Sequence, residues 1–383
     1  MEDETEINNW DDLKIKEDLL RGIYAYGFEK PSEIQKRAIQ PILEKNDVIA
    51  QAQSGSGKTG TFAISVLERI DISKKETQAL ILAPTHELVR QTSRVITSLG
   101  LYLDGLVVKT LIGGTSTRDD MYELRDNVPH VVVGTVGRVM DMFQKKHLLG
   151  NELKILILDE ADEMLSQGFN ENVRNMFRDY FPIDLQVVLF SATMPDEIIQ
   201  LSDKFMRTPL HLLMKKEELS LQCIAQYFVA VQNDEMKYSV LKDIFSVISV
   251  SKCIIYCNNV RRVMELHDYM IRDGFSVCCI HSKMDKSQRS EVFNHFRNGD
   301  TRVLISSDIT ARGIDIQQVS TVINFDLTIN VHTYLHRIGR GGRWGRKGVA
   351  INFITRMDVP DIKKIENYYK IEVQELPANF KGI

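Results

Sequence analysis

Short runs of apolar, largely β-branched residues recur along this chain, and longer stretches with a helical pattern separate them. Strands that alternate with helices form βαβ units, and these build parallel sheets. The runs before residue 195 are "DVIAQA", "ALILAP", "HVVVGT", "KILILDE" and "QVVLFSAT"; those after it are "CIIYCN", "SVCCIH", "RVLISSD", "TVINFD" and "GVAINFI". Because the pattern occurs twice, we predict an α/β protein with two domains of similar plan.

Length and charge limit the possible partners. A chain of 383 residues favours two domains over one. The formal net charge is −4, so nucleic acid would have to bind in a local groove rather than through overall attraction. The first ten residues lack the apolar core of a signal peptide, and no apolar run reaches the ~20 residues that span a bilayer. We therefore expect an intracellular protein without a membrane partner.

The strand–helix pattern is interrupted at "RTPLHLLMKKEELSLQ", between the two halves. This stretch carries a charged patch, which is typical of an exposed linker. We predict a first domain over residues 1–214, a linker over 215–221 and a second domain over 222–383. Only the first half contains a glycine-rich phosphate loop, so the two domains are not chemically equivalent.

The phosphate loop is "AQSGSGKT", residues 52–59, between an apolar run and a helical stretch. A strand, a glycine-rich turn and a helix N-terminus direct backbone N–H groups at a phosphate. Ala52 replaces the usual first glycine. Lys58 stands where it would reach the β- and γ-phosphates, and Thr59 where it would hold Mg²⁺. The loop residues predicted to contact the nucleotide are Ser54, Gly55, Ser56, Gly57, Lys58 and Thr59.

A pair of carboxylates follows the run "ILIL". Asp159 and Glu160 are therefore expected at the carboxyl end of a buried strand, where parallel sheets bind their ligands. Next to a phosphate loop, Asp159 would hold Mg²⁺ and Glu160 would orient and deprotonate the attacking water.

The run "HRIGRGGRWGR", residues 336–346, sets four arginines three residues apart. A flexible tract is disfavoured because the strand-like "KGVAINFI" follows directly. A nucleic-acid grip and a part of an active site are the other interpretations. Since the second half lacks a phosphate loop, arginines from it could supply positive charge to ATP.

The run "GFEKPSEIQ", residues 27–35, ends in Gln35. A glutamine amide offers one acceptor and two donors, which match the N6/N7 edge of adenine. From the residue pattern alone, a position on the surface of a helix is the other interpretation.

Together these motifs resemble the DEAD-box ATP-dependent RNA helicases over essentially the whole chain. The motifs are "DEAD" at residues 159–162, "SAT" at 191–193, "RGID" at 312–315 and "HRIGRGGR" at 336–343. The resemblance implies two RecA-like domains of helicase superfamily 2, built on a P-loop NTPase plan, that close over ATP and one RNA strand. It also implies an ATP hydrolase that unwinds short RNA duplexes with ATP and Mg²⁺.

By position, the resemblance implies that Phe28 stacks on adenine, that Gln35 reads its edge and that Asp315 contacts the ribose. Trp10 stands where the family has an upstream aromatic residue. The residues that it assigns to coupling between ATP and RNA are Asp162, Ser191, Thr193, His336 and Arg337.

Arg340 and Arg343 match the arginine fingers of the family. Such arginines raise the rate of phosphoryl transfer by about 10³–10⁵-fold. With Lys58, Asp159 and Glu160 they complete the predicted catalytic set. Trp344 and Arg346 fall outside this motif, and we interpret them as structural or surface residues.

For RNA, the resemblance implies contacts with the phosphate backbone and little sequence preference. The matching positions are Pro84, Thr85, Gly113, Gly114, Thr135, Gly137, Arg138, Arg289, Ser307 and Asp308. Most departures from the family also fall on the RNA side: His86 replaces arginine, Val136 replaces proline and Lys286 replaces glutamine. We predict weaker RNA binding at His86, because arginine is always charged whereas histidine is largely neutral near neutral pH. We also expect a looser loop at Val136.

Finer runs such as "LLRGIYAYGFEKPS" and "HRIGRGGRWGRKGVAINF" resemble the branch of the family that acts in translation initiation. This branch implies a cytoplasmic monomer with scaffold proteins of translation initiation as partners. One alternative is an ATP-gated RNA clamp like the close paralogue in the exon-junction complex, which would be nuclear. Another is an RNA-dependent ATPase with weakened unwinding.

Overall fold

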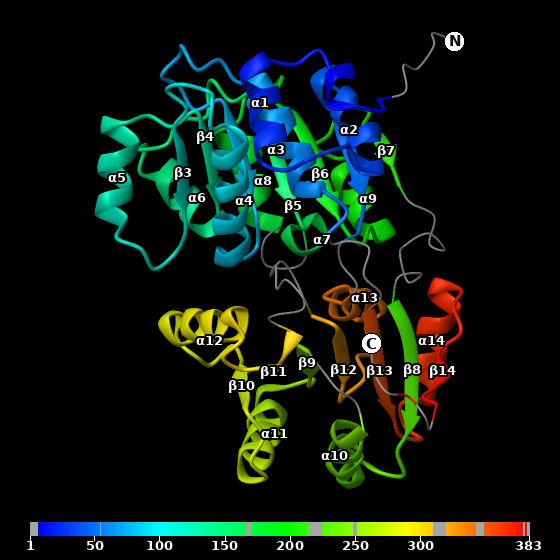
Figure 1. Cartoon of the computed structure of the whole chain (residues 1–383). Coiled ribbons are helices and arrows are strands. Elements are labelled where there is room, and N and C mark those ends of the chain that lie inside the picture. Colours follow the sequence, from blue (N-terminus) through cyan, green and yellow to red (C-terminus); the bar gives the residue numbers. More distant parts are fainter. Residues whose placement is uncertain are drawn as a thin grey trace. The chain divides into compact units, whose positions relative to one another are not determined.

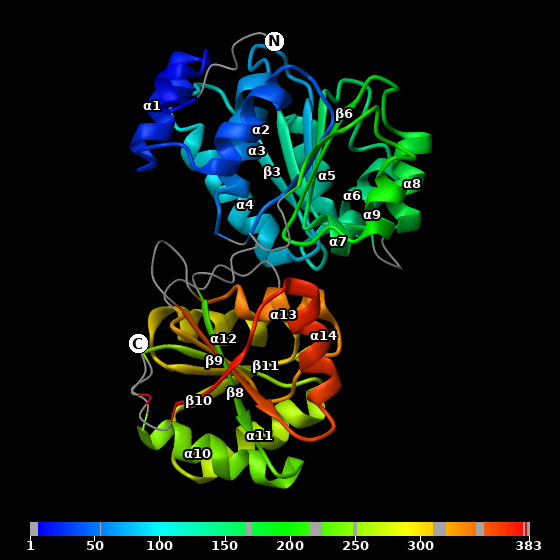
Figure 2. The same cartoon turned by 90° about the vertical axis from the view of Figure 1, so that its right-hand side faces the viewer.

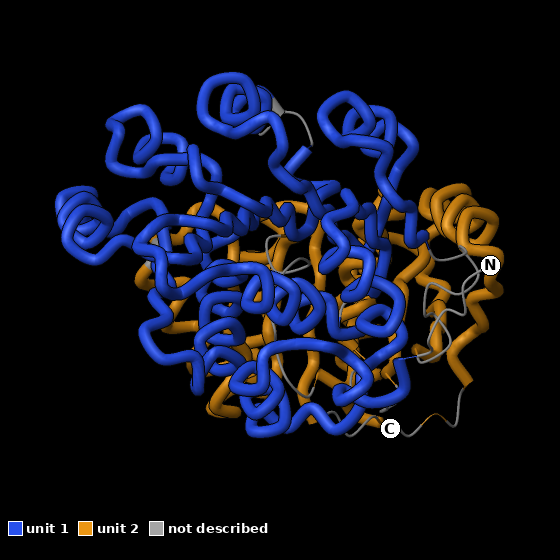
Figure 3. The backbone as a smooth tube through the Cα atoms, turned by 90° about the horizontal axis from the view of Figure 1, so that it is seen from above, with its two compact units in different colours: residues 1–213 blue, residues 214–383 orange. Residues whose placement is uncertain are grey.

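The computed structural model describes residues 7–53, 55–165, 170–213, 224–247, 251–308, 319–341, 348–377 and 380, except the side chains of Asn170 and Lys286. The chain divides into two compact units, Met1–Leu213 and Met214–Ile383, which are coloured separately in Figure 3. The predicted linker, residues 215–221, lies outside the described residues.

Unit 1 is built on a parallel sheet of seven strands in the order β3-β4-β2-β5-β6-β1-β7 (Figure 1). Its register places Ile49 opposite Leu189 and Leu80 opposite Leu156. The strands are β1 (Val48–Gln51), β2 (Ala79–Leu82), β3 (Val108–Leu111), β4 (Val131–Gly134), β5 (Ile155–Asp159), β6 (Gln186–Ser191) and β7 (Leu210–Leu212).

Helices cover both faces of this sheet, with α2, α3 and α4 on one side and α6, α8 and α9 on the other (Figure 2). No helix in the described ranges is long and apolar enough to cross a membrane. The helices of unit 1 are η1 (Trp10–Asp12), α1 (Glu17–Ala25), α2 (Glu33–Leu43), α3 (Lys58–Arg69), α4 (His86–Leu99), α5 (Thr117–Asp126), α6 (Val136–Gln144), α7 (Ala161–Met164), α8 (Asn170–Asp179) and α9 (Asp196–Ser202).

Unit 2 repeats the plan with seven parallel strands in the order β10-β11-β9-β12-β13-β8-β14. The strands are β8 (Ile224–Ala230), β9 (Cys253–Tyr256), β10 (Val277–Ile280), β11 (Val303–Ser306), β12 (Thr321–Asn324), β13 (Gly348–Ile354) and β14 (Gln374–Glu375). The helices are η2 (Asp234–Met236), α10 (Lys237–Val247), α11 (Val260–Arg272), α12 (Lys286–Asn298), α13 (Val331–Ile338) and α14 (Val359–Tyr369). The predicted α/β class with two parallel sheets is thus confirmed.

The continuous apolar runs in the sequence follow from this double covering. Successive side chains of a strand point to opposite faces, so a strand with helices on both sides has to be apolar at every position. In β9, Cys253 and Ile255 pack in the core beside α10 and α11, whereas Ile254 and Tyr256 pack in the core beside α12.

The strand order places the two groups of motifs side by side in unit 1. The phosphate loop, the Asp-Glu-Ala-Asp segment and the Ser-Ala-Thr segment follow β1, β5 and β6 or end them, and these strands are neighbours. The predicted RNA loops follow β2, β4 and β3, which are also neighbours. The carboxyl edge of one sheet therefore sets the loops predicted to bind the nucleotide next to the loops predicted to bind RNA.

Candidate functional site

The phosphate loop ends at Gly57, which precedes the first residue of α3. Gly57 has φ 104° and ψ 11°, a left-handed conformation that favours glycine. Lys58 begins the helix, and its side chain is 8% exposed. Its Nζ lies 4.0 Å from Glu160 Oε1 and makes no hydrogen bond with any described residue. A buried ammonium group needs an anion, and the phosphates of a nucleotide would supply one.

The carboxylate pair lies at the end of β5 and is buried. Asp159 is the last residue of the strand, and Glu160 has a left-handed backbone with φ 51° and ψ 55°. Burial raises the pKa of Asp159 above its ordinary value, and the adjacent Glu160 carboxylate adds to this effect. A divalent cation would stabilise the charged form, and carboxylate and hydroxyl oxygens are the ligands that Mg²⁺ prefers. Asp159 and Thr59 therefore fit the predicted magnesium site.

The adenine side of the site lies against the first turn of α3. Gln35 completes a capping box in α2, where its Oε1 accepts a hydrogen bond of 2.7 Å from Ser32 N. A Cβ atom at Gly60 would lie 2.8 Å from Gln35 Nε2 and 2.9 Å from Phe28 Cε2. The predicted adenine residues, Phe28 and Gln35, are thus brought together over Gly60. Sequence reasoning missed Gly60, although a glycine in the first turns of a helix is a usable signal.

Trp10 holds the loop that carries Phe28. Its side chain is fully buried, and Nε1 donates a hydrogen bond of 3.0 Å to the carbonyl oxygen of Phe28. The two rings are stacked at an interplanar angle of 20° with their centroids 6.1 Å apart. The upstream aromatic residue therefore fixes both the backbone and the ring of the predicted adenine contact.

The coupling residues of unit 1 form one buried cluster. Asp162 accepts hydrogen bonds from Ser191 Oγ at 2.6 Å and from Thr193 Oγ1 at 2.8 Å. The carbonyl oxygen of Ser191 accepts a bond of 3.0 Å from Ala52 N, at the start of the phosphate loop. The Asp-Glu-Ala-Asp segment, the Ser-Ala-Thr segment and the phosphate loop are thus directly connected.

The predicted RNA loops of unit 1 open helices. Thr85 is the N-cap of α4 and accepts a hydrogen bond of 3.3 Å from Leu88 N, and Thr135 is the N-cap of α6. Pro84 precedes Thr85 in the loop after β2, and Gly137 is the second residue of α6. Gly113 and Gly114 lie in the loop after β3, where Gly114 has φ 85°. Helix N-termini bind phosphate through free N–H groups, so the local geometry suits a nucleic-acid backbone.

Arg138 has a structural role that the sequence did not indicate. Its side chain is buried and forms an ion pair with Asp120. The guanidinium also donates to Thr115 Oγ1 at 3.1 Å and to the carbonyl oxygen of Thr115 at 2.9 Å. Arg138 therefore fastens the loop after β3 to α5 and α6, and its contact with RNA stays a prediction.

The three named departures from the family, at His86, Val136 and Lys286, lie at helix starts. His86 is the first residue of α4 and is partly buried. Val136 is the first residue of α6, and its side chain is fully buried in the core beside Val139. Packing of Val136 opposes the loosening that we expected from the loss of proline. The side chain of Lys286, at the start of α12, lies outside the described residues.

In unit 2, Arg289 lies on α12, Ser307 and Asp308 follow β11, and His336 and Arg337 lie on α13. Arg340 follows α13 directly, is buried, and donates through Nε to the carbonyl oxygen of His336 at 3.3 Å. Three predicted site residues lie outside the described residues: Ser54, Asp315 and Arg343.

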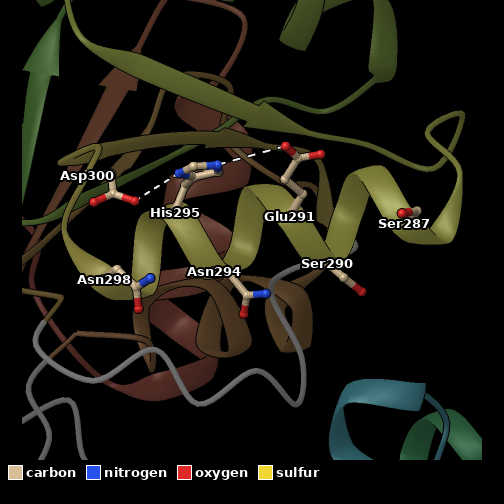
Figure 4. Close-up of a pocket in the computed structure, with 7 residues that line it drawn as sticks. All are labelled: Ser287, Ser290, Glu291, Asn294, His295, Asn298 and Asp300. Atoms are coloured by element: carbon tan, nitrogen blue, oxygen red, sulfur yellow. Dashed lines mark hydrogen bonds and ion pairs between the residues drawn. The ribbon is translucent and has the colours of Figure 1, made fainter.

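A polar hollow of about 480 Å³ lies along α12 (Figure 4). His295 is bonded there to Asp300 with 2.8 Å between Nδ1 and Oδ2. The lining residues are Ser287, Ser290, Glu291, Asn294, His295, Asn298 and Asp300. None of the described residues that we predict to contact ATP or RNA lines it, so it lies apart from the predicted chemistry.

Comparisons with known proteins agree with these motifs. The family model "DEAD/DEAH box helicase" matches residues 32–201, and "Helicase conserved C-terminal domain" matches residues 236–345. "Eukaryotic initiation factor 4A" of Caenorhabditis elegans is 51% identical over 98% of this chain and 93% of its own length. "ATP-dependent RNA helicase eIF4A" of Pyricularia oryzae is 50% identical over 98% and 94%.

A solved structure gives the same result. Dbp5 of S. cerevisiae, bound to RNA and ADP BeF3, matches with a TM-score of 0.90 and 34% identity, over 96% of this chain and 95% of that one. The predicted resemblance is confirmed by sequence and by fold, and the chain belongs to the DEAD/DEAH-box helicase family.

Proposed function

We propose that this protein is an RNA-stimulated ATPase that unwinds short RNA duplexes in translation initiation. One observation supports the proposal: the strand order of unit 1 places the predicted nucleotide loops beside the predicted RNA loops, and Asp162 accepts hydrogen bonds from both Ser191 and Thr193. The relatives named eukaryotic initiation factor 4A support the role in translation. The neighbour bound to RNA and ADP BeF3 supports RNA and a nucleotide as ligands.

The nucleotide is proposed to bind with its adenine on Phe28 and its phosphates on the loop before α3. Gln35 would donate from Nε2 to an adenine ring nitrogen, because its Oε1 already accepts from Ser32 N. Lys58 would pair with the β- and γ-phosphates, which would satisfy its buried ammonium group.

Hydrolysis is proposed to depend on Glu160, which would orient the attacking water and accept its proton. Mg²⁺, held by Asp159 and Thr59, supplies neutralisation of phosphate charge when it is bound. Arg340 and Arg343 would stabilise the negative charge that develops on the transferred phosphoryl group. Unit 2 has no phosphate loop of its own, so its contribution to ATP hydrolysis would be the positive charge of these arginine fingers.

RNA is proposed to bind through its backbone to the loops after β2, β3 and β4 and to the segment after β11. Ser191 and Thr193 couple this event to the nucleotide, because their shared partner Asp162 lies two residues after Glu160. Backbone recognition gives little sequence preference, so we propose that scaffold proteins of translation initiation select the RNA.

The test is an ATPase assay with and without single-stranded RNA, combined with displacement of a short RNA duplex. We expect hydrolysis that RNA stimulates and displacement that requires ATP. Arg340→Ala should lower the stimulated rate by about 10³-fold or more while ATP still binds. Hydrolysis that ignores RNA, with no displacement, would contradict the proposed function.

Two alternatives keep the same residues and differ in outcome. An ATP-gated RNA clamp would stop hydrolysing ATP when RNA and a scaffold partner are both present. This result would indicate a nuclear protein. A weakened helicase would hydrolyse ATP in response to RNA without displacing a strand. Loss of the family's arginine at His86 favours the second alternative over the first.

A further inference from the structure

The guanidinium of Arg337 lies where three neighbouring strands of unit 2 end. In the sheet, β11, β9 and β12 are adjacent. Arg337 Nη2 donates to Asn258 Oδ1 after β9 at 2.9 Å, and Nη1 donates to the carbonyl oxygen of Asp326 after β12 at 2.8 Å. Its Nε lies 2.5 Å from Asp308 Oδ1 after β11. The Arg337 side chain is fully buried, whereas that of Asp308 is 44% exposed.

Two buried amides continue from this guanidinium into the sheet. Asn324 and Asn352 lie opposite each other on β12 and β13, and both are fully buried. Asn324 Oδ1 accepts from Arg337 Nη1 at 3.3 Å, and Asn324 Nδ2 donates to Asn352 Oδ1 at 2.8 Å. Asn352 Nδ2 in turn donates to the carbonyl oxygen of Tyr227 on β8 at 2.9 Å.

These bonds leave each amide one orientation. The carbonyl of Tyr227 can only accept, so Asn352 turns its NH₂ toward β8 and its oxygen toward Asn324. Asn324 must then turn its own oxygen toward Arg337. Buried amides in an apolar sheet are costly unless they are bonded, so this chain of bonds holds the guanidinium in a single place.

The position of Arg337 matters for both predicted ligands. A phosphate is repelled by a bare carboxylate, and Arg337 neutralises Asp308, which is a predicted RNA contact together with its neighbour Ser307. Arg337 also belongs to α13 and lies three residues before Arg340, the predicted finger. The buried side chain of Arg337 thus connects the segment after β11 to α13, the helix that precedes the predicted arginine finger.

We propose that Asn324 is a positioning residue for the RNA-stimulated reaction. It holds Arg337 so that Asp308 stays neutralised and the segment after β11 stays fixed to α13. This inference rests on the proposed function, since it concerns how RNA stimulates hydrolysis. It assigns a role to a buried polar residue of the sheet that touches neither ATP nor RNA.

The test compares the 383-residue chain with Asn324→Leu, which keeps the side-chain branching and removes the Oδ1 acceptor but leaves Arg337 Nη1 bonded to the carbonyl oxygen of Asp326. The RNA concentration for half-maximal stimulation and the KM for ATP are both measured. We expect the RNA concentration for half-maximal stimulation to rise about tenfold, with little change in the KM for ATP. A tenfold change corresponds to the free energy that is typically lost with one hydrogen bond to a charged group. Should this variant not fold, Asn324→Ser, too short to reach Arg337, carries the same expectation.

Tyr334→Phe is the matched control for a purely structural network. The Tyr334 hydroxyl donates to Gln226 Oε1 at 2.7 Å and accepts from Asn352 Nδ2 at 3.3 Å, away from Arg337. We expect Tyr334→Phe to leave the RNA concentration for half-maximal stimulation unchanged.

Two results would overturn the inference. The RNA concentration for half-maximal stimulation could be unchanged in Asn324→Leu, or it could rise equally in Asn324→Leu and Tyr334→Phe. A wild-type protein that RNA does not stimulate would instead contradict the proposed function. The two failures are therefore distinguishable.

Discussion

Gly60 shows how a residue without a side chain can define a binding site. A Cβ atom at this position would lie within 3.0 Å of both Phe28 and Gln35. Contacts this short force the neighbours to move, and overpacking of this kind costs about 1–3 kcal/mol. The absence of a side chain at Gly60 is what lets the predicted adenine residues rest on α3.

We therefore expect Gly60→Ala to weaken ATP binding about tenfold, because Phe28 and Gln35 must shift away from the nucleotide. Titration with a fluorescent ATP analogue without RNA measures the effect. Thermal stability should fall by no more than about 2 kcal/mol, since the preference of a helix for alanine over glycine, about 1 kcal/mol, offsets part of the overpacking. Gly137→Ala is the control, because a Cβ atom there meets nothing within 4 Å. Equal nucleotide affinity in both variants would refute the packing argument.

Two of the buried arginines, Arg138 and Arg337, show the limits of motif assignment at the residue scale. The family pattern assigns Arg138 to RNA and Arg337 to coupling, yet the structure bonds each guanidinium to its own unit. Their partners, such as Asp120 and Asn258, lie in other elements and carry no motif of their own. Side-chain pairing of this kind cannot be inferred from spacing along the chain.

At the scale of elements, the loops of unit 1 that we predict to bind RNA lie where strands end and helices begin. Each of these loops leaves a parallel strand and enters a helix, so several helix N-termini gather at one edge of the sheet. α4 begins at His86, immediately after its N-cap Thr85. A charge at His86 would therefore act at the same point as the helix N–H groups.

We expect His86→Arg to strengthen RNA binding and to steepen its salt dependence by up to about 0.7 in the slope of log affinity against log salt. The reason is one additional phosphate contact from a guanidinium that is always charged. Fluorescence anisotropy with a single-stranded RNA at several salt concentrations measures both quantities. His86→Gln, which adds no charge, should match the wild type. A slope in His86→Arg equal to that of the wild type would argue against a phosphate near this residue.

At the scale of the whole molecule, the chain consists of two α/β units with separate sheets and separate cores. We propose that the exposed linker between them spans residues 215–221, as its charged, aperiodic sequence indicates. Each unit has the covered sheet and apolar core of a domain, so each should resist proteases better than the segment between them.

Limited trypsin digestion tests this division. We expect the first cuts after Lys215 or Lys216, giving one fragment for each unit, which mass spectrometry would identify. A variant with both lysines changed to glutamine should lose these cuts and keep its stability. First cuts distributed inside either unit would contradict the proposed boundaries.

The amino-acid sequence alone predicts the class of fold, which is confirmed, and a set of nucleotide contacts, which stay predictions. Apolar runs separated by helical stretches predict parallel sheets, and the strand before "SGSGKT" places Lys58 at a helix N-terminus. These features are local, because they depend on residues that are neighbours along the chain and on backbone preferences that neighbours set.

The neighbours of each strand and the partners of each buried polar group follow from tertiary contacts that no local pattern carries. The order β3-β4-β2-β5-β6-β1-β7 sets the predicted RNA loops beside the predicted nucleotide loops, and Arg337 bonds to Asn258 across 79 positions of the chain. Such pairs form because burial requires every polar group to find a partner, whatever its distance in sequence. Local patterns specify the elements, whereas the satisfaction of buried groups specifies how the elements combine into a site.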